Sequence, residues 1–115
     1  MDLSTILMVV AVVGAVAVMI LRSRGNVSSE AARKLVQDGA KLIDVRSPGE
    51  FSGGHLPGAT NLPIADLSNK LGKLGPKDKP IVLYCASGAR SAMAAGTLKR
   101  AGFLQVHNLG AMRRW

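Results

Sequence analysis

The sequence predicts a small α/β domain, a parallel sheet flanked by helices, preceded by one transmembrane helix. Short apolar segments typical of buried strands alternate with segments of helical pattern, which is the arrangement of a parallel sheet wrapped on both faces. The 115 residues leave room for one such domain. Residues 3–21 stand apart, because these nineteen residues contain no charge.

The segment 3–21 has the length and composition of a membrane span. As a helix it would measure about 28 Å at about 1.5 Å per residue, close to the hydrocarbon thickness of a bilayer. It has no polar face, which argues against a core helix. A cleaved signal peptide is the alternative, but Asp2 and no Lys or Arg precedes the apolar core, and Ala15-Val16-Ala17 is followed by more apolar residues. We expect a retained anchor.

Positive charges follow this segment. Arg22 and Arg24 come directly after it, and Arg33 and Lys34 lie close behind. The positive-inside rule places this flank in the cytoplasm, so we expect a single-pass protein with its N-terminus outside and its domain on the cytoplasmic side. The predicted organisation is a transmembrane helix over 3–21, a linker over 22–27 and an α/β domain over 28–115.

The sequence predicts a helix and a strand in the first part of the domain. Residues 28–38 have helical spacing, with Ser28 as a capping residue and Glu30 in the first turn. Gly39 is suited to end this helix. The apolar segment 41–45 then predicts a buried strand.

The middle of the domain is rich in turns. Ser47 and Glu50 have capping-box spacing, with Pro48 at the first helical position, so a brief helical turn is expected there. The pattern then predicts a short strand over 59–62, a helix over 64–71 and a loop over 72–79.

The last third carries the clearest strand signal. Residues 80–84 are apolar and β-branched, and they predict a buried strand. We expect a loop over 85–90, a helix over 91–101, a strand over 103–107 and a closing segment over 108–115.

The charge of the chain is strongly basic. Residues 22–115 carry all 15 Lys and Arg but only six of the seven acids. Aromatic residues are few and no basic run exceeds two residues, so nucleic acid is not the expected partner. Attraction to anionic membrane lipid or to small anions explains the charge more simply.

The loop between the strand and helix of the last third has the chemistry of an anion site. It reads Cys85 to Arg90, CASGAR, and Ser91 opens the helix. Successive backbone N–H groups and the helix N-terminus can converge on one centre, with Gly88 supplying an unusual backbone angle and Arg90 a cation. The candidate substrate-binding residues are Ala86, Ser87, Gly88, Ala89, Arg90 and Ser91.

The one cysteine of the chain, Cys85, lies at the focus of this loop. It can form no intrachain disulfide, and a lone cysteine is either an inert small hydrophobe or a nucleophile. N–H donors and a helix terminus stabilise a thiolate, which is the reactive form. The glycine, the arginine and the following helix favour the nucleophile.

Several spaced motifs resemble the rhodanese family. CASGARS resembles its C-x-x-G-x-R active-site loop. The other matching segments, in order, are LIDVR at 42–46, EF at 50–51, GHLPGA at 54–59, NLP at 61–63 and NLGAM at 108–112 with Trp115. The resemblance runs from about residue 27 to 115 and implies a rhodanese-like fold.

The resemblance also implies an activity, that of a thiosulfate or persulfide sulfurtransferase. Cys85 would take sulfane sulfur from a small anionic donor and become a persulfide, and a thiol or cyanide would then remove that sulfur. Arg90 would bind the anionic donor, and no metal or organic cofactor would be required. A low-pKa thiol suits this exchange.

Alternatives remain at the level of the sequence. Phosphatases and arsenate reductases of related fold use Cys-x5-Arg, whereas four residues separate Cys85 from Arg90 here, so a smaller pocket is expected. A non-enzymatic persulfide carrier, a docking module or a sulfide or redox sensor at the membrane is the other reading. Asp44 and Arg46 are supporting residues, either orienting the site or forming a structural ion pair, while Glu50 and His55 are expected to be structural.

Overall fold

The computed structural model describes the backbone of residues 1–23 and 26–115 and the side chains of residues 1–17 and 26–115. Helix α1 spans Leu3–Ser23, and the Asp2 carboxylate accepts hydrogen bonds from Thr5 N and Ser4 Oγ at its start. Part of the expected span and of the expected linker, residues 18–25, lies outside the described side chains. Within the described part of the chain, no helix combines the length and the apolar character needed to cross a membrane.

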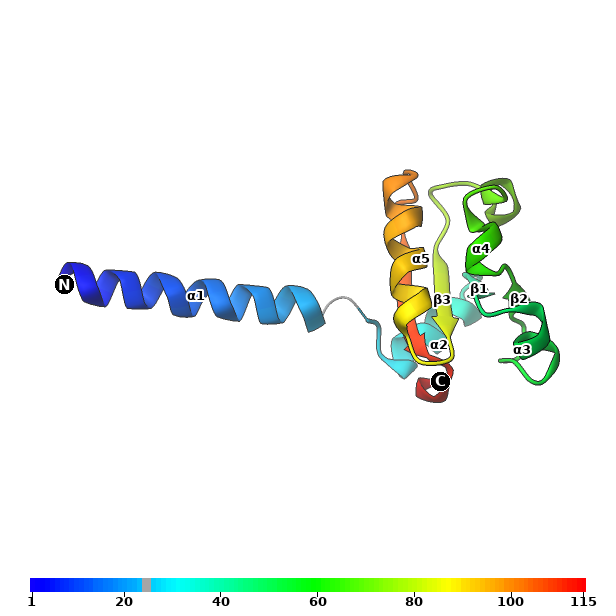
Figure 1. Cartoon of the computed structure of the whole chain (residues 1–115), viewed down its shortest axis with the longest axis horizontal. Coiled ribbons are helices and arrows are strands. Elements are labelled where there is room, and N and C mark those ends of the chain that lie inside the picture. The colour runs from blue at the N-terminus through cyan, green and yellow to red at the C-terminus, as the bar shows by residue number, and fades with distance from the viewer. Residues whose placement is uncertain (24–25) are drawn as a thin grey trace.

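Four parallel strands form the sheet of the domain. Their order is β2-β1-β3-β4, and each neighbouring pair is parallel. The prediction of a small parallel sheet flanked by helices is thereby confirmed (Figure 1). The strands are β1 (Lys41–Asp44), β2 (Thr60–Asn61), β3 (Ile81–Cys85) and β4 (Val106–Ala111).

Helices cover both faces of this sheet (Figure 1). Helix α2 packs Ala32 against one face, and α5 packs Ala94 and Leu98 against the other. The helical elements of the domain are α2 (Ser29–Gln37), α3 (Pro48–Ser52), α4 (Ile64–Leu67), η1 (Leu71–Leu74), α5 (Ala89–Arg100) and η2 (Met112–Arg114).

The strand β3 runs through the centre of the core. All five of its residues are buried, and its side chains alternate between the two faces as strand geometry requires. Ile81, Leu83 and Cys85 face the cluster under α5, whereas Val82 and Tyr84 face the cluster under α2. This placement fixes Cys85 at the carboxyl end of a central strand.

Two predicted helix starts are confirmed by their caps. Ser28 Oγ accepts a hydrogen bond from Ala31 N at the start of α2. At α3, Ser47 Oγ accepts from Glu50 N, and the Glu50 side chain accepts from Ser47 N, so the predicted capping box with Pro48 at its first turn is present.

Three predicted boundaries were wrong. The helix expected over 64–71 ends at Leu67, and a 3₁₀ turn occupies Leu71–Leu74, where a loop was expected. Helix α5 begins at Ala89 instead of 91, since Gly88 caps it with a φ of 105°. The strand expected over 103–107 is β4, displaced to Val106–Ala111, because Phe103 turns into the core and a register shift lets Asn108-Leu109-Gly110 continue the strand.

Candidate active site

The candidate site is the turn between β3 and α5. Cys85 ends the strand with no solvent-exposed surface, and the helix begins four residues later. Gly88 makes this turn possible, because its φ of 105° lies in the left-handed region that other residues rarely adopt. A Cβ at Gly88 would also lie 3.6 Å from backbone atoms of Gly110 and Ala111.

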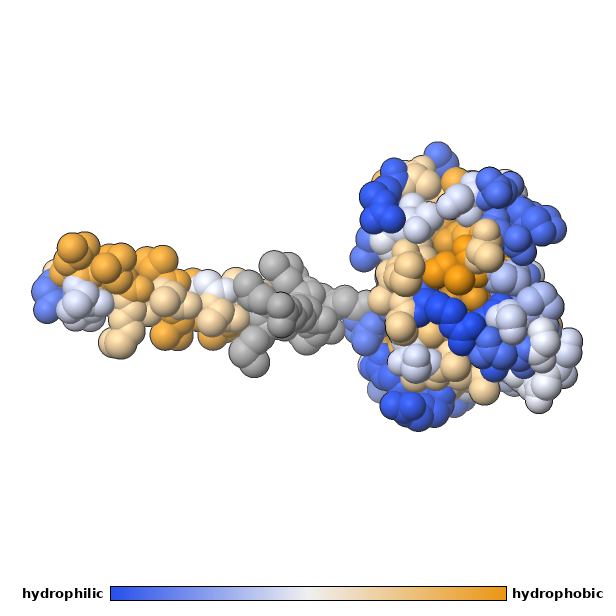
Figure 2. Space-filling view, viewed as in Figure 1, coloured by the Kyte–Doolittle hydropathy of each residue, from blue (hydrophilic) through white to orange (hydrophobic). Residues whose placement is uncertain are grey.

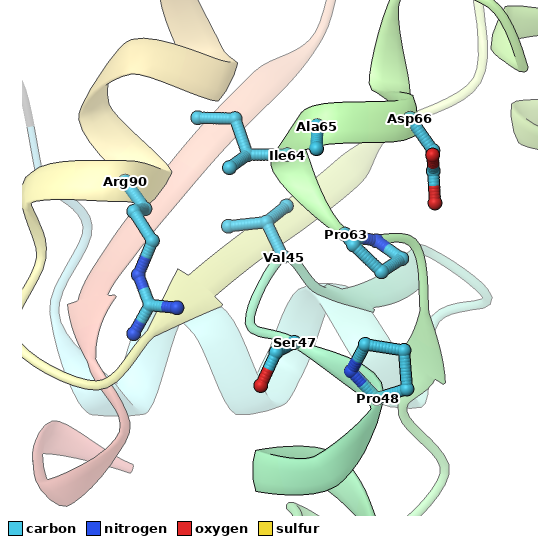
Figure 3. A pocket seen from close by; sticks show the side chains of 8 residues that line it. All are labelled: Val45, Ser47, Pro48, Pro63, Ile64, Ala65, Asp66 and Arg90. Atoms are coloured by element: carbon cyan, nitrogen blue, oxygen red, sulfur yellow. The ribbon is translucent and has the colours of Figure 1, made fainter.

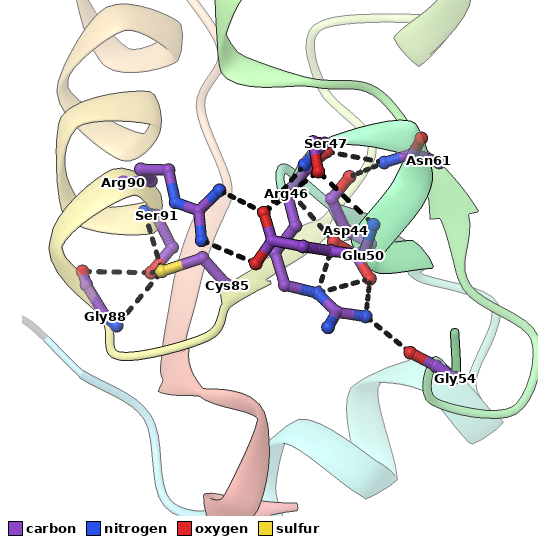
Figure 4. A network of polar contacts seen from close by, with 10 residues as sticks. All are labelled: Asp44, Arg46, Ser47, Glu50, Gly54, Asn61, Cys85, Gly88, Arg90 and Ser91. Carbon is purple, nitrogen blue, oxygen red and sulfur yellow. Dashed lines mark hydrogen bonds and ion pairs between the residues drawn. The ribbon is translucent and has the colours of Figure 1, made fainter. Parts of the chain in front are cut away.

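Hydrogen-bond donors of this turn surround the Cys85 sulfur (Figure 4). Gly88 N lies 3.0 Å from Sγ and Ser91 N lies 3.4 Å from it. The Ser91 hydroxyl is 3.5 Å from Sγ and donates to the Gly88 carbonyl at 3.1 Å. A protonated thiol donates to that hydroxyl, whereas a thiolate accepts from the two amides and from a rotated hydroxyl.

These hydrogen bonds shift the pKa of the Cys85 thiol. Burial raises the pKa of the Cys85 thiol, but hydrogen bonds from the Ser91 hydroxyl and from the amides of Ser91, Gly88 and Ser87 outweigh it. The net effect is a pKa below the ordinary value of a cysteine, so a larger share of the sulfur is thiolate.

Arg90 is held by Glu50 in a bidentate ion pair. Its Nη1 lies 2.7 Å from Glu50 Oε1 and its Nη2 lies 2.9 Å from Oε2. Figure 4 shows the guanidinium between the Cys85 turn and α3. The bond to Glu50 raises the pKa of Arg90, and the charge of Cys85 raises it further. The Arg90 hydrogen bond lowers the pKa of Glu50 to about 2, with help from Ser47 N.

Asp44 and Arg46 form a second, buried ion pair near the site. The carboxylate accepts from Arg46 N, Nε and Nη2 at 2.8–3.1 Å, and Nη2 also donates to the Gly54 carbonyl at 2.7 Å. The bond to Asp44 raises the pKa of Arg46 despite its burial. Beside the pair, burial raises the pKa of Tyr84 to about 12, and its hydroxyl accepts from Leu56 N.

A hollow of about 270 Å³ lies next to Arg90. Figure 3 shows side chains from the end of β1, from α3 and from α4 around it. Figure 2 shows apolar surface on the domain between the positions of α4 and α5. The lining consists mainly of apolar and small side chains: Val45, Ser47, Pro48, Pro63, Ile64, Ala65, Asp66 and Arg90.

The structure brings the predicted loop residues together at one place. Cys85, Gly88, Arg90 and Ser91 gather at the carboxyl end of β3, on the sheet edge where Asp44 ends β1. Asp44 and Arg46 bind each other rather than the loop.

Sequence reasoning missed one residue of the site, Glu50. We assigned its carboxylate to its own helix cap, but the carboxylate serves the cap and Arg90 at once. The signal in the sequence was the EF motif at 50–51, one of the segments that resemble the rhodanese family. His55, by contrast, stacks on Phe51 with ring centres 3.7 Å apart, and its Nδ1 lies 3.0 Å from Phe51 O.

Together the fold and the site define a class: a small parallel α/β domain with a cysteine at the focus of a strand-to-helix turn. The chain belongs to the rhodanese family, since the rhodanese-like domain matches residues 28–115. This confirms the resemblance at the level of the family.

Relatives of known sequence and structure agree. The chain is 44% identical over 77 residues to the uncharacterized protein YqhL of Bacillus subtilis, covering 66% of this chain and 60% of that protein. It is 39% identical over 75 residues to a sulfurtransferase of Allochromatium vinosum, covering 64% and 69%. The structure of the human single-domain sulfurtransferase TSTD1 matches with a TM-score of 0.69 and 28% identity, covering 78% of this chain and 93% of that one. Two of these relatives are named as sulfurtransferases.

Proposed function

We propose that this protein moves sulfane sulfur from a small anionic donor, such as thiosulfate or a persulfide, through a Cys85 persulfide to a thiophilic acceptor. The observation that carries this proposal is the set of polar contacts around one sulfur: Gly88 N donates at 3.0 Å, Ser91 N donates at 3.4 Å, and the Ser91 hydroxyl lies at 3.5 Å. The same donors that favour a thiolate are suited to hold the terminal sulfur of a persulfide anion.

The first step is a displacement at sulfur. With thiosulfate, the Cys85 thiolate attacks the sulfane sulfur, a new S–S bond forms, and the bond between the two sulfurs of the donor breaks. The electron pair of that bond leaves with sulfite, and the cysteine becomes a persulfide anion. Both sides carry a total charge of −3, and no external oxidant or reductant enters.

The second step regenerates the thiolate. Cyanide or a thiolate acceptor attacks the outer sulfur of the persulfide, and the S–S bond breaks with its electron pair returning to Cys85. The loop amides and Ser91 stabilise the thiolate as it leaves. Arg90 supplies the cation for the anionic donor, and these steps use only groups of the chain and the two substrates.

Turnover with thiosulfate and cyanide tests this proposal. We expect the chain to release sulfite and form thiocyanate, and we expect Cys85→Ser to abolish both while its melting temperature stays near wild type. Turnover that persists in a folded Cys85→Ser variant would overturn the role of Cys85. A wild-type protein that is inert to thiosulfate but accepts sulfur from a protein persulfide would instead be a carrier or docking module.

We further propose that residues 3–21 attach this domain to a membrane, with the N-terminus outside and the domain in the cytoplasm. The support is the uncharged sequence of this segment and the arginines after it. The full chain should resist carbonate extraction from membranes, and Val12→Asp should release it. Protease should digest the domain in inverted vesicles and spare it in sealed spheroplasts. Extraction of the wild-type chain, or the reverse protease pattern, would overturn the anchor or its orientation.

A further inference from the structure

The guanidinium that would bind an anionic donor is already occupied. Glu50 fills both arms of the Arg90 fork, with N–O distances of 2.7 and 2.9 Å. Two parallel N–H···O bonds are also the geometry in which arginine binds oxyanions. A donor that approaches Arg90 through its oxygens must therefore displace the carboxylate.

We infer that Glu50 is a specificity-determining residue of the proposed sulfur transfer. Its carboxylate competes with the sulfur donor for Arg90, so it disfavours small, highly charged donors such as thiosulfate. It leaves an advantage to donors of lower charge that carry a small hydrocarbon group on their leaving group. This inference rests on the proposed function and names the donor class that the site prefers.

The ion pair is open enough to exchange. Both side chains are 36% exposed, and an exposed pair is held less firmly than a buried one. Protonation does not open it, since Arg90 keeps the pKa of Glu50 at about 2, far below neutral pH. The carboxylate therefore stays charged at neutral pH and competes with the sulfur donor for Arg90.

The hollow beside Arg90 is the reason that a donor with a hydrocarbon group is preferred. Val45, Pro48 and Ile64 are apolar members of its lining, and its volume of about 270 Å³ suits a small hydrocarbon group. Asp66 lines the same hollow on the side away from Arg90, where it pairs with Lys70 at 3.9 Å (Figure 3). A dianion that approaches Arg90 therefore meets the Glu50 carboxylate, whereas a hydrocarbon group meets an apolar wall.

Two donors that differ in charge and in hydrocarbon content provide the experiment. Thiosulfate is a dianion without carbon, and benzenethiosulfonate is a monoanion with a phenyl group. Both give their sulfane sulfur to a thiolate, and they release sulfite and benzenesulfinate, respectively. Steady-state kinetics with cyanide as acceptor would compare the two donors on the full chain and on Glu50→Gln.

Glu50→Gln removes the charge but keeps an oxygen that can accept from Ser47 in the helix cap. We expect its KM for thiosulfate to fall about fivefold, with little change in kcat, because Arg90 becomes free. For benzenethiosulfonate we expect a change of less than about twofold. Asp38→Asn is the matched control: it removes one carboxylate from another exposed ion pair, that with Lys34, outside the lining of the hollow, and should retain the wild-type ratio of the two KM values. The same shift in Asp38→Asn would mean that the net charge of the chain, not the place of Glu50 beside Arg90, is responsible.

A binding measurement separates this inference from the proposed function. In the Cys85→Ser background, which transfers no sulfur, Glu50→Gln should tighten thiosulfate binding about fivefold in calorimetric titration. Unchanged binding and an unchanged KM would overturn the inference. Tightened binding in a protein whose wild type shows no sulfur transfer would overturn the proposed function and leave the role of Glu50 intact.

Discussion

Two arginine–carboxylate pairs lie at the same edge of the sheet, and they differ mainly in burial. In the Asp44–Arg46 pair the side chains are 0% and 8% exposed, and Arg46 is also tied to the Gly54 carbonyl. In the Glu50–Arg90 pair both side chains are 36% exposed, and the guanidinium lies between Glu50 and the Cys85 turn. The chemistry of the two pairs is the same, but their surroundings are not.

The difference in burial gives the two pairs different roles: one is fixed in the fold, and the other can exchange its partner. A buried charge without its partner is very costly, so the Asp44–Arg46 pair is fixed in the fold. A half-exposed pair can trade its partner for water or for a ligand at small cost. The sheet edge thus combines one permanent ion pair, which holds the segment after β1, with one replaceable pair beside the candidate nucleophile.

The largest expected effect is on stability, at the buried pair. Asp44→Ala leaves the Arg46 guanidinium buried without its carboxylate, which should cost about 3–5 kcal/mol of unfolding free energy. Urea unfolding followed by circular dichroism measures the loss. A loss equal to that of Glu50→Gln would remove the distinction between the two pairs.

The next effect is on donor binding, at the open pair. Arg90→Ala should raise the KM for thiosulfate about tenfold or more, because the guanidinium that donates charged hydrogen bonds to thiosulfate is gone. The free energy of unfolding in urea should stay near wild type. Adding Glu50→Gln to Arg90→Ala should not lower the KM for thiosulfate. A double variant whose KM for thiosulfate is lower than that of Arg90→Ala would show that Glu50 acts by another route than Arg90.

A smaller effect concerns the protonation of Cys85. Ser91→Ala removes a hydrogen bond that lowers the Cys85 pKa, so that pKa should rise. The rate of alkylation by iodoacetamide against pH would show its midpoint at higher pH than in wild type. The lowered pKa also stabilises the folded state above the unfolded pKa, and this contribution fades as pH falls through the folded pKa. An unchanged midpoint would mean that the amides alone set the thiolate.

The smallest effect is on the stability of Glu50→Gln at neutral pH. Its melting temperature should stay close to wild type, because the open pair contributes little to folding. The pKa of Glu50 is lowered from 4.5 to about 2, so the contribution of the pair is present above about pH 4.5 and is lost as pH falls through about 2. The small difference in stability between the two proteins should therefore disappear as pH falls through that range. A large loss of stability in Glu50→Gln at neutral pH would show that this pair stabilises the fold as the buried pair does.

The sequence predicted what local patterns encode. The parallel sheet, the caps at Ser28 and Ser47 and the Cys85 turn follow from strand apolarity, cap spacing and glycine placement. We predicted strand β4 at the wrong residues, because Asn108-Leu109-Gly110 resembles a turn in sequence. In the fold it continues the strand past a register shift, with Gly110 at a φ of 91°.

The partner of Arg90 depends on tertiary structure and was not predictable in this way. Glu50 and Arg90 are forty residues apart, and only the pairing of β1 with β3 in the sheet brings α3, which follows β1, beside the Cys85 turn. A capping-box pattern explains this glutamate at the level of the helix, and the EF motif at 50–51 does not say which residue its carboxylate contacts. The membrane segment stays a prediction of composition.

The most direct test of the central claim is the intact mass of the full chain after exposure to thiosulfate. We predict a gain of one sulfur atom on the wild type, its loss on addition of cyanide, and no gain on Cys85→Ser. Arg90→Ala should gain the same atom more slowly. A wild-type protein that never gains sulfur would contradict the proposed transfer from thiosulfate, and a Cys85→Ser protein that gains it equally would contradict Cys85 as the carrier of sulfane sulfur.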